Sequence, residues 1–407
     1  MTKKFRIKNI FSYLGPGLIT ASVVIGPGSI STNSWIGANY GCRLVWMLVV
    51  AIISMAVYTL MASRFGIISK KSILTVVSEK YGRWLAILVG ISSYFMTISF
   101  EFGNNLGAAT ATESLTGFGA NLWPFVFSGT ALIIIFTSPD LYKVLERIMM
   151  VLVAVMITAF TANLLFTNPS GMKVAAGIVP SLPKGSLTAA AGLAGTTFCI
   201  NAAFYQAYLV QDKGWTLDNY KKCVSDSIAG VFVLGIISLL IMVTAASSLY
   251  PHGIQVTSAG DMAVQLEILF GRSAKFIFCI GLWAASFSSI VVTSFLGGGM
   301  LSDSLGWGGS TRNIRTKVLA SVSILIGMTA AVFFRGNFVD AIVFAQALTL
   351  LAFPVFAVVL ILLSNNKEIM GVYRNTWYEN ILAGMGVCLL TWMMVNTYLV
   401  VIEKISN

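Results

Sequence analysis

Near its beginning the chain reads Val24-Ile25-Gly26-Pro27-Gly28-Ser29, within an apolar stretch that covers residues 12–36. In a helix interior, glycine costs about 1 kcal/mol and proline about 3 kcal/mol relative to alanine. Two glycines around a proline therefore predict that a membrane-spanning helix breaks here. At this depth in a membrane, the backbone groups freed by a break are tolerated only where they line a cavity or bind something. We therefore expect a binding site at the break.

The composition indicates that most of the chain lies within a lipid bilayer. Only 10% of its 407 residues are charged and 57% are hydrophobic, and the mean hydropathy is +0.85. A soluble domain has about a quarter charged residues, so this chain could not cover a water-soluble surface. Stretches long enough to cross about 30 Å of hydrocarbon recur along it. We count about eleven, with cores near residues 12–36, 44–63, 84–109, 121–138, 147–166, 187–210, 227–249, 276–300, 318–334, 340–363 and 381–402.

The sixth stretch also has an unusual centre. Residues 192–201 are mostly small and polar, although no proline occurs among them. This stretch lies five places after the first, where an inverted repeat of two five-helix halves would have its second discontinuous helix. We therefore predict an all-α polytopic membrane protein with a 5+5 inverted repeat in which helices 1 and 6 are broken. One transmembrane domain would fill residues 1–407, with repeats at about 11–166 and 187–363 and an extra helix at about 381–402.

The net charge of +11 is distributed as membrane topology predicts. Most lysines and arginines fall in alternate loops, on the same side as Lys3, Lys4, Arg6 and Lys8. Because cytoplasmic loops are enriched in basic residues, we place the N-terminus in the cytoplasm and the C-terminus outside. The expected partners are then the lipid bilayer and a small-molecule or ion substrate, with no nucleic acid. We expect a multi-pass protein of the cell (inner or plasma) membrane that acts as a monomer.

Few side chains suit catalysis or permanent metal binding. The five cysteines are odd in number and show no CxxC spacing, which argues against a disulfide framework or a structural zinc site. The single histidine, His252, follows the seventh stretch, so an imidazole proton relay within the membrane is excluded. No nucleophile–base pair or cofactor fingerprint occurs. We predict that the chain is not an enzyme and needs no cofactor, although it could bind a sodium ion.

Short motifs in order along the whole chain are similar to those of one transporter family. They are Gly15-Pro16-Gly17 with a second Pro-Gly in the same helix, Arg64-Phe65-Gly66-Ile67, Val179-Pro180-Ser181-Leu182-Pro183, Ser288-Ser289, Gly306-Trp307, Gln346 followed by Phe353-Pro354, and Met370-Gly371. Through these motifs the chain resembles the NRAMP family (natural resistance-associated macrophage proteins), proton-coupled importers of manganese and iron. The resemblance implies the broken-helix inverted-repeat fold that many amino-acid transporters share.

The residues that bind metal in that family are replaced here. The family's first break reads Asp-Pro-Gly-Asn, and the places of its two metal ligands hold Gly26 and Ser29. The family's Met-Pro-His in the sixth helix aligns with Cys199-Ile200-Asn201, and a further histidine with Gln206. Its acidic pair in the third helix aligns with Glu101 and Asn104. The resemblance therefore implies the architecture and the location of the site, but not the metal ligands.

The loss of the aspartate favours a different cargo. It leaves the N-terminus of the second half-helix open, with free N–H groups and a positive dipole end that attract anions. The leading hypothesis is a secondary active transporter that works by alternating access and carries a small anion, bicarbonate or a small carboxylate, coupled to sodium. The alternative is a transporter of a divalent metal cation, of the magnesium or manganese type, that keeps part of its water shell.

The candidate site residues lie on four of the predicted stretches. As substrate-binding residues we predict Gly26, Pro27, Gly28, Ser29, Thr196, Thr197, Cys199, Asn201 and Gln346, with Ser31, Thr32 and Asn33 as further polar residues of the cavity. For coupling to an ion we predict Glu101, Asn104 and Gln206. Glu101 leads this group because an ionisable residue within a span is a functional candidate by default.

Overall fold

The computed structural model describes residues 15–137, 139–167, 169–334 and 336–406, and all its regular elements are helices. The α-helices are α2 (Pro16–Val24), α3 (Pro27–Tyr40), α4 (Val45–Ile68), α5 (Ile73–Tyr81), α6 (Arg83–Thr116), α7 (Trp123–Thr137), α8 (Pro139–Thr167), α9 (Gly171–Ala176), α10 (Leu187–Thr197), α11 (Ile200–Asp212), α12 (Tyr220–Ser248), α13 (Ala259–Ala263), α14 (Glu267–Phe270), α15 (Ala274–Ser304), α16 (Ile314–Phe333), α17 (Phe338–Leu348), α18 (Phe353–Asn365), α19 (Lys367–Met370) and α20 (Trp377–Ser406). Short 3₁₀ turns connect several of them: η2 (Ala120–Leu122), η3 (Leu217–Asn219), η4 (Tyr250–His252), η5 (Val264–Leu266), η6 (Gly271–Ser273), η7 (Thr349–Ala352) and η8 (Gly371–Tyr373).

The first span is broken at the predicted glycines. Helix α2 ends at Val24, and the N–H of Ile25 still donates to the carbonyl of Ala21. Gly26 is extended, with φ −108° and ψ −171°, and Pro27 begins α3. Proline suits the first position of a helix because it has no N–H to leave unpaired there. The prediction of a discontinuous first helix is confirmed.

The sixth span is broken as well, without a proline. Helix α10 ends at Thr197 and α11 begins at Ile200, so two residues, Phe198 and Cys199, have non-helical backbone angles. The ring of Phe198 packs 5.3 Å from that of Tyr58 and 5.2 Å from that of Phe353, measured between ring centroids. The second break therefore coincides with tertiary packing of this large side chain and not with a residue of low helix propensity.

The tenth span is also interrupted, which the sequence analysis did not predict. Helix α17 ends at Leu348, the 3₁₀ turn η7 follows, and α18 begins at Phe353 with Pro354 in its first turn. Proline fits without strain near the start of a helix, so this proline does not by itself indicate a break. The hydropathy of residues 340–363 therefore predicted one continuous span. The interruption leaves Gln346 in the last turn of α17.

The number of spans agrees with the prediction of about eleven. In the part of the chain that the structure describes, nine helical segments are long and apolar enough to cross a membrane. The divided first span and helix α8, of which Val153–Thr167 is apolar, supply two further crossings. The all-α polytopic fold with broken first and sixth helices is thus confirmed, whereas the limits of the two repeats stay a prediction.

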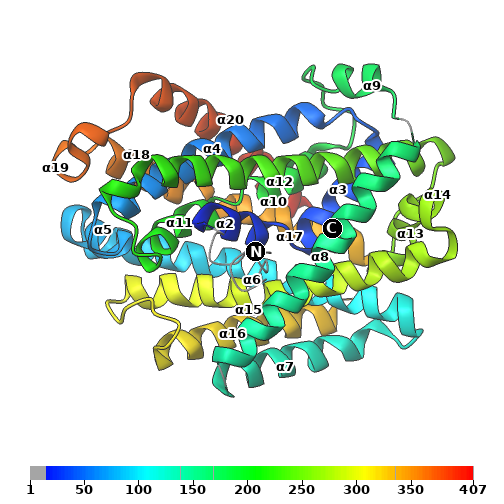
Figure 1. The fold of residues 1–407 in the computed structure, drawn as a ribbon, viewed down its shortest axis with the longest axis horizontal. Helices are drawn as coiled ribbons and strands as arrows, with labels where there is room; N and C mark the ends of the chain where they lie inside the picture. Colours follow the sequence, from blue (N-terminus) through cyan, green and yellow to red (C-terminus); the bar gives the residue numbers. More distant parts are fainter. Residues whose placement is uncertain (1–14, 138, 168, 335, 407) are drawn as a thin grey trace, which may run out of the picture.

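The broken helices lie in the middle of the molecule. Figure 1 shows α4 and α12 on one side of them and α6, α15 and α16 on the other. Helices α2 and α3 pack against α12, and α10 packs against α17. Helices α5 and α19 lie at one end of the molecule, called the α5 end here, and α9, α13 and α14 lie at the opposite α9 end (Figure 1).

A largely buried ion pair fixes the last helix to the bundle. One terminal nitrogen of Arg64, near the end of α4, lies 3.0 Å from the Glu379 carboxylate at the start of α20 and donates to Asn375 at 3.0 Å. The side chains of Arg64 and Glu379 are 7% and 20% exposed. Removal of one partner of a buried pair costs more than the pair itself contributes, because the other charge is left without compensation.

We therefore expect Arg64→Ala to lower the stability of the folded protein by about 3 kcal/mol. The matched control is Lys71→Ala, which removes an ion pair with Glu79 whose side chains are 58% and 50% exposed. Exposed pairs contribute about 0–1 kcal/mol. Thermal unfolding of the purified variants measures both effects, and equal shifts in unfolding temperature would contradict the assigned role of Arg64.

Candidate functional site

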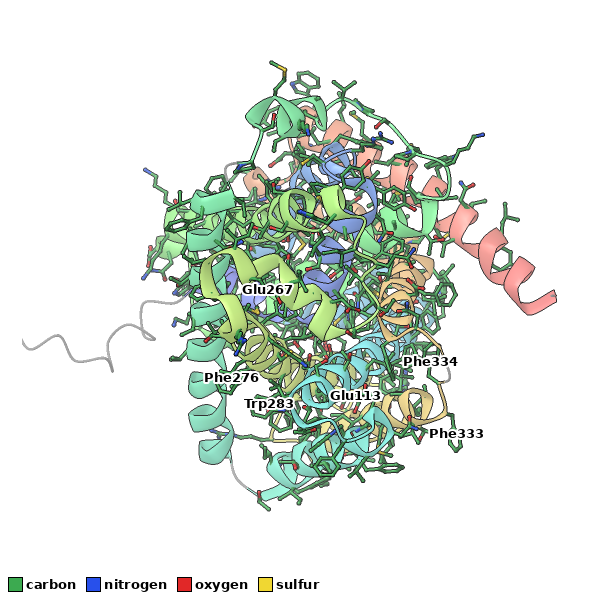
Figure 2. All side chains as sticks on the ribbon, turned by 90° about the vertical axis from the view of Figure 1, so that its right-hand side faces the viewer. Glu113, Glu267, Phe276, Trp283, Phe333 and Phe334 are labelled. Carbon is green, nitrogen blue, oxygen red and sulfur yellow. The ribbon has the colours of Figure 1, made fainter. Side chains whose placement is uncertain are left out.

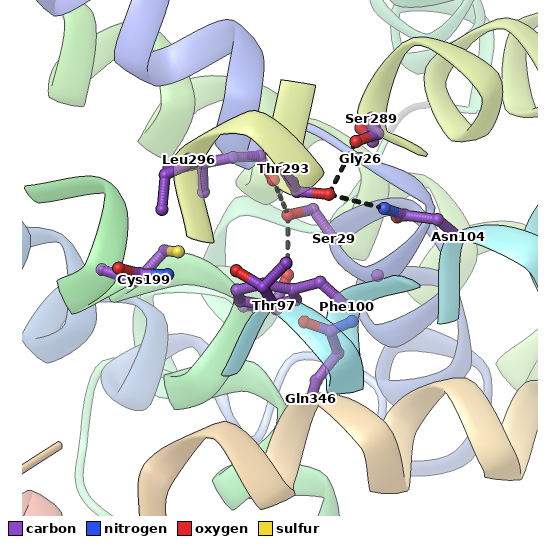
Figure 3. Close-up of a pocket in the computed structure, with 14 residues that line it drawn as sticks. Gly26, Ser29, Thr97, Phe100, Asn104, Cys199, Ser289, Thr293, Leu296 and Gln346 are labelled. Carbon is purple, nitrogen blue, oxygen red and sulfur yellow. Dashed lines mark hydrogen bonds between the residues drawn. The ribbon is translucent and has the colours of Figure 1, made fainter. Parts of the chain in front are cut away.

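A small cavity lies where the two breaks meet (Figure 3). Its volume is about 30 Å³, which is enough for about two water molecules. Fourteen residues line it: Val24, Gly26, Gly28, Ser29, Thr97, Phe100, Asn104, Thr196, Cys199, Asn201, Ser289, Thr293, Leu296 and Gln346. They come from α2, α3, α6, α10, α11, α15 and α17 and from the two breaks, so nearly every helix of the centre contributes to this central cavity.

The Ser29 hydroxyl joins the two broken spans. It donates to the backbone carbonyl of Val24 at 2.8 Å, across the break between α2 and α3. It also lies 2.8 Å from the Thr196 hydroxyl near the end of α10. Because the single Ser29 proton goes to Val24, Thr196 is the donor in the second bond. The carbonyl left at the end of α2 therefore finds a partner without a charged residue.

The N-terminus of α3 faces the same cavity. No side chain caps this helix, and Ile30 is the first residue in it whose N–H bonds to an earlier carbonyl, that of Gly26. Pro27 has no N–H, so the N–H groups of Gly28 and Ser29 have no partner within the helix. The open helix end predicted from the sequence is present, with its positive end at the cavity.

Gln346 is tightly enclosed beside this helix end. A Cβ atom placed on Gly28 would lie 2.3 Å from Gln346 Nε2, and one on Gly195 would lie 2.0 Å from the Gln346 carbonyl oxygen. Real Cβ atoms essentially never come this close to another heavy atom. Only glycine at both positions lets α3 and α10 approach α17, so the carboxamide of Gln346 is held against the mouth of α3.

A buried carboxyl lies behind the wall formed by α15. Glu101, on α6, is fully buried, and its Oε1 accepts a hydrogen bond from the Thr293 hydroxyl at 2.5 Å. Asn104 also donates to Thr293, at 3.2 Å, as Figure 3 shows. The second carboxyl oxygen of Glu101 has no hydrogen-bond partner. Glu101 is therefore one hydrogen bond away from a residue that lines the cavity.

Towards the α5 end, Asn201 and Cys199 bound the cavity. Ser93 on α6 donates to the Asn201 side-chain oxygen at 2.8 Å and to the sulfur of Met300 on α15 at 3.4 Å. Cys199 lies at the N-terminus of α11, where its thiol is beside the N–H groups of Asn201 and Ala202. All five cysteines are unpaired thiols.

This geometry can now be compared with known proteins. The family model "Natural resistance-associated macrophage protein-like" matches residues 17–401. The chain belongs to the Nramp family. Its match to the family covers both broken spans, the Glu101 region and α20, so the resemblance seen in the sequence is confirmed over nearly the whole chain.

Similar Nramp relatives are described as divalent metal cation transporters. The MntH protein of Yersinia pestis is 25% identical over 402 residues, which are 96% of this chain and 95% of that protein. MntH of Deinococcus radiodurans is 26% identical over 384 residues, with 90% of this chain and 84% of that protein covered.

The fold is similar to that of solved transporters. The Eremococcus coleocola manganese transporter superposes with a TM-score of 0.78 at 17% identity, over 98% of this chain and 88% of that one. The nucleobase-cation-symport-1 transporter Mhp1 superposes with a TM-score of 0.60 at 14% identity, over 96% and 93% of the two chains. At these identities the likeness establishes the fold alone, which this Nramp protein shares with both solved transporters.

The structure brings most of the predicted residues of this Nramp protein together. Seven of the nine predicted substrate-binding residues line the central cavity: Gly26, Gly28, Ser29, Thr196, Cys199, Asn201 and Gln346. Pro27 and Thr197 lie next to lining residues but do not line the cavity themselves. Ser31, Thr32 and Asn33 are buried within α3 and do not line it either. What these residues bind stays a prediction.

The three residues predicted for ion coupling differ in their position relative to the cavity. Asn104 lines the cavity, and Glu101 lies directly behind it. Gln206, in contrast, is hydrogen-bonded to Thr20 on α2 and Ser227 on α12, away from the cavity. Its hydrogen bonds join α11 to these two helices, and its part in ion coupling stays a prediction.

Asn104 is the one α6 residue of the cavity that was predicted from the sequence, and the residues that α15 contributes were not predicted. Thr97, Ser289 and Thr293 line the cavity, together with Phe100 and Leu296. A usable signal existed, because Thr97, Glu101 and Asn104 recur at helical spacing and form one polar face of an otherwise apolar span. Ser289 and Thr293 have the same spacing of four residues.

A double substitution tests the enclosure of Gln346. We expect Gly28→Ala to destabilise the protein by about 1–3 kcal/mol, because the new methyl group would overlap the Gln346 carboxamide. In Gly28→Ala/Gln346→Ala the overlap is gone, so the double variant should be more stable than the sum of the two single effects predicts. Thermal unfolding of the three purified variants measures this coupling. Purely additive effects would show that the two residues do not touch.

Proposed function

We propose that this chain is a secondary transporter that moves a divalent cation across the membrane, with Glu101 exchanging a proton. The observation that carries the proposal is the buried Glu101 carboxyl behind a cavity that no lysine, arginine or histidine lines. A buried carboxyl with one hydrogen-bond donor stays ionised only next to a cation, and otherwise takes up a proton. A proton and a metal ion can therefore compete to neutralise the negative charge of the Glu101 carboxylate.

The lining favours a hard cation that keeps part of its water shell. Hydroxyl and amide oxygens dominate its polar groups, from Ser29, Asn104, Thr196, Ser289 and Thr293. Among the described residues, no group of three or more His, Cys, Asp or Glu side chains could hold a metal ion. A softer transition-metal ion would need such ligands, whereas a magnesium- or manganese-type ion prefers oxygen ligands and can retain waters in their place. The relatives described as divalent metal cation transporters support the same class of cargo.

Hydrogen bonds join the helices on both sides of the cavity. Towards the α5 end, Tyr208 on α11 donates to Asp303 on α15 at 2.7 Å, beyond the bond between Ser93 and Asn201. Towards the α9 end, Gln265 donates to Ser34 on α3 at 3.0 Å. We propose that these two sets of bonds break in turn, which would widen the cavity for a hydrated ion and expose it to one side at a time.

The open N-terminus of α3 supports a second candidate, the small anion coupled to sodium. Two N–H groups and a dipole end worth about +0.5 charge would favour an anion there. Two features oppose this reading. The Gln346 carboxamide covers Gly28, and an ionised Glu101 would repel an anion from behind Thr293. Neither bicarbonate nor sodium has support from the relatives, so the cation is the stronger proposal.

Uptake into proteoliposomes distinguishes these cargoes. We expect uptake of Mn²⁺ or Mg²⁺ that is faster when the entry side is acidic, with no requirement for sodium. Glu101→Gln, which cannot exchange a proton, should remove the pH dependence because its side chain stays neutral throughout. The control Glu113→Gln changes a partly exposed carboxylate at the far end of α6 and should leave the pH dependence intact.

Bicarbonate uptake that depends on sodium, with no metal uptake, would contradict the proposed cation cargo and support the anion instead. Unchanged pH dependence in Glu101→Gln, with metal uptake retained, would assign proton coupling to another group.

A gain of function tests the site itself. Gly26 has an extended backbone that any residue can adopt, and a Cβ atom there would lie 3.0 Å from Ser289 Oγ as its closest contact. We expect Gly26→Asp to tighten Mn²⁺ binding by at least the ~10-fold that an outer-shell partner contributes to metal affinity, because it adds a carboxylate at the cavity. Gly26→Asn is the neutral control of the same shape. Isothermal titration of both variants with Mn²⁺ measures the difference, and equal affinities would place the cation elsewhere.

A further inference from the structure

A second and larger cavity lies at the α9 end of the molecule. Its volume is about 520 Å³, within the roughly 300–1,000 Å³ of known small-molecule sites. It is formed by the end of α3, the turn to α4, the end of α8, the α9 segment and the end of α12, and it shares no lining residue with the central cavity. Figure 2 looks onto this end of the molecule. We call it the outer cavity.

Among the described residues, two cationic side chains line the outer cavity and no acidic side chain does. They are Arg43, in the turn between α3 and α4, and Lys173, on α9. Neither belongs to an ion pair among the described residues. Burial raises the pKa of the Cys42 thiol and the charge of Lys173 opposes this shift, which places the lysine close to the turn that carries Arg43. Most other basic residues lie at the α5 end, so topology does not explain this pair.

Hydrogen bonds fix the α9 segment onto the α3–α4 turn. The backbone N–H of Trp46 donates to Gly177 and its indole N–H donates to the carbonyl of Ser181, both at 2.8 Å. The Tyr40 hydroxyl donates to the carbonyl of Gly185 at 3.0 Å. The turn that carries Arg43 and the segment that carries Lys173 are therefore joined by these hydrogen bonds, and the outer cavity is formed before a ligand binds.

The same segment presents apolar side chains to its surroundings. Met172, Ile178 and Val179 are 83%, 54% and 65% exposed, next to Lys173 and close to Lys184. Exposed apolar side chains in a segment that also carries lysines are typical of a chain that lies in a membrane surface, with the apolar groups among the acyl chains. Tyr40 and Tyr250, which line the outer cavity, are residue types enriched at the same depth.

We propose that the outer cavity binds the phosphate of an anionic phospholipid headgroup. Arg43 and Lys173 would contact the phosphate, since a guanidinium pairs with phosphate oxygens in a fixed two-pronged geometry and an ammonium adds a second charge. The lipid tails would pass over Met172 and Val179 into the bilayer. The exposed apolar groups favour a lipid over free phosphate as the source of the anion. Such a lipid would hold the α9 segment against α3, the half-helix that carries Ser29.

Titration of the purified full-length protein with phosphatidylglycerol, followed by native mass spectrometry, tests this site. We expect saturable binding of phosphatidylglycerol that phosphatidylcholine does not reproduce. In Arg43→Gln/Lys173→Gln the affinity should fall about 30-fold, since each basic residue near a lipid surface contributes about 1 kcal/mol. The control Arg272→Gln/Lys275→Gln removes two exposed cations at the same end, outside the outer cavity, and should bind as the unsubstituted protein does.

Three results would overturn the proposal. Equal loss of binding in both double variants would mean that net surface charge alone attracts the lipid. Equal binding of phosphatidylcholine would mean that the cations do not select the headgroup. Competition by millimolar inorganic phosphate, with equal affinity for phosphate and lipid, would assign the outer cavity to a free anion instead.

Discussion

The structure depends on how the backbone groups at the two midplane breaks are satisfied. Lipid offers no hydrogen bonds, so each carbonyl or N–H freed by a break needs a partner from the protein. The Ser29 hydroxyl supplies one for Val24 and in turn accepts from Thr196, so one side chain joins α2, α3 and α10. The N–H of Gly26 also donates to the Val24 carbonyl, at 2.8 Å, so this backbone group has two donors within its own span. The bond between Ser29 and Thr196 therefore joins the two broken spans through their side chains, at the edge of the central cavity.

The sequence predicted the breaks in the helices correctly where the residues at the break themselves disfavour a helix. The Gly-Pro-Gly sequence around Pro27 forces a break whatever surrounds it, so sequence alone located it correctly. The break at Phe198 and Cys199 carries no such residue and followed only from its position in the repeat. The interruption at η7 was missed because Pro354 lies in the first turn of α18, where proline is compatible with a helix and leaves the hydropathy unchanged.

The site was harder to predict because it depends on helix rotation and on partners far apart in sequence. Glu101 and Thr293, which share a hydrogen bond, are 192 residues apart. Asn201 and Gln206 lie on the same half-helix, but five residues turn the side chain by about 140°, so one reaches the cavity and the other faces α2 and α12. The alignment with the family placed Gln206 near the site, whereas in the structure its side chain bonds to α2 and α12 and does not line the cavity.

Gly26 and Ser29 make the first break neutral. With no acidic side chain at the break, the carboxyl closest to the central cavity is that of Glu101, which reaches it only through Thr293. Under the proposed function, a cation in this cavity would be held by neutral oxygens and balanced by a carboxylate that it does not touch, so it would shed its waters less readily than one in direct contact with an aspartate. An ion that keeps more of its water makes fewer direct bonds to the protein, so the softness of the protein's ligands would discriminate less between metal ions. Selectivity would then rest on the size that the cavity reaches when one set of flanking hydrogen bonds opens.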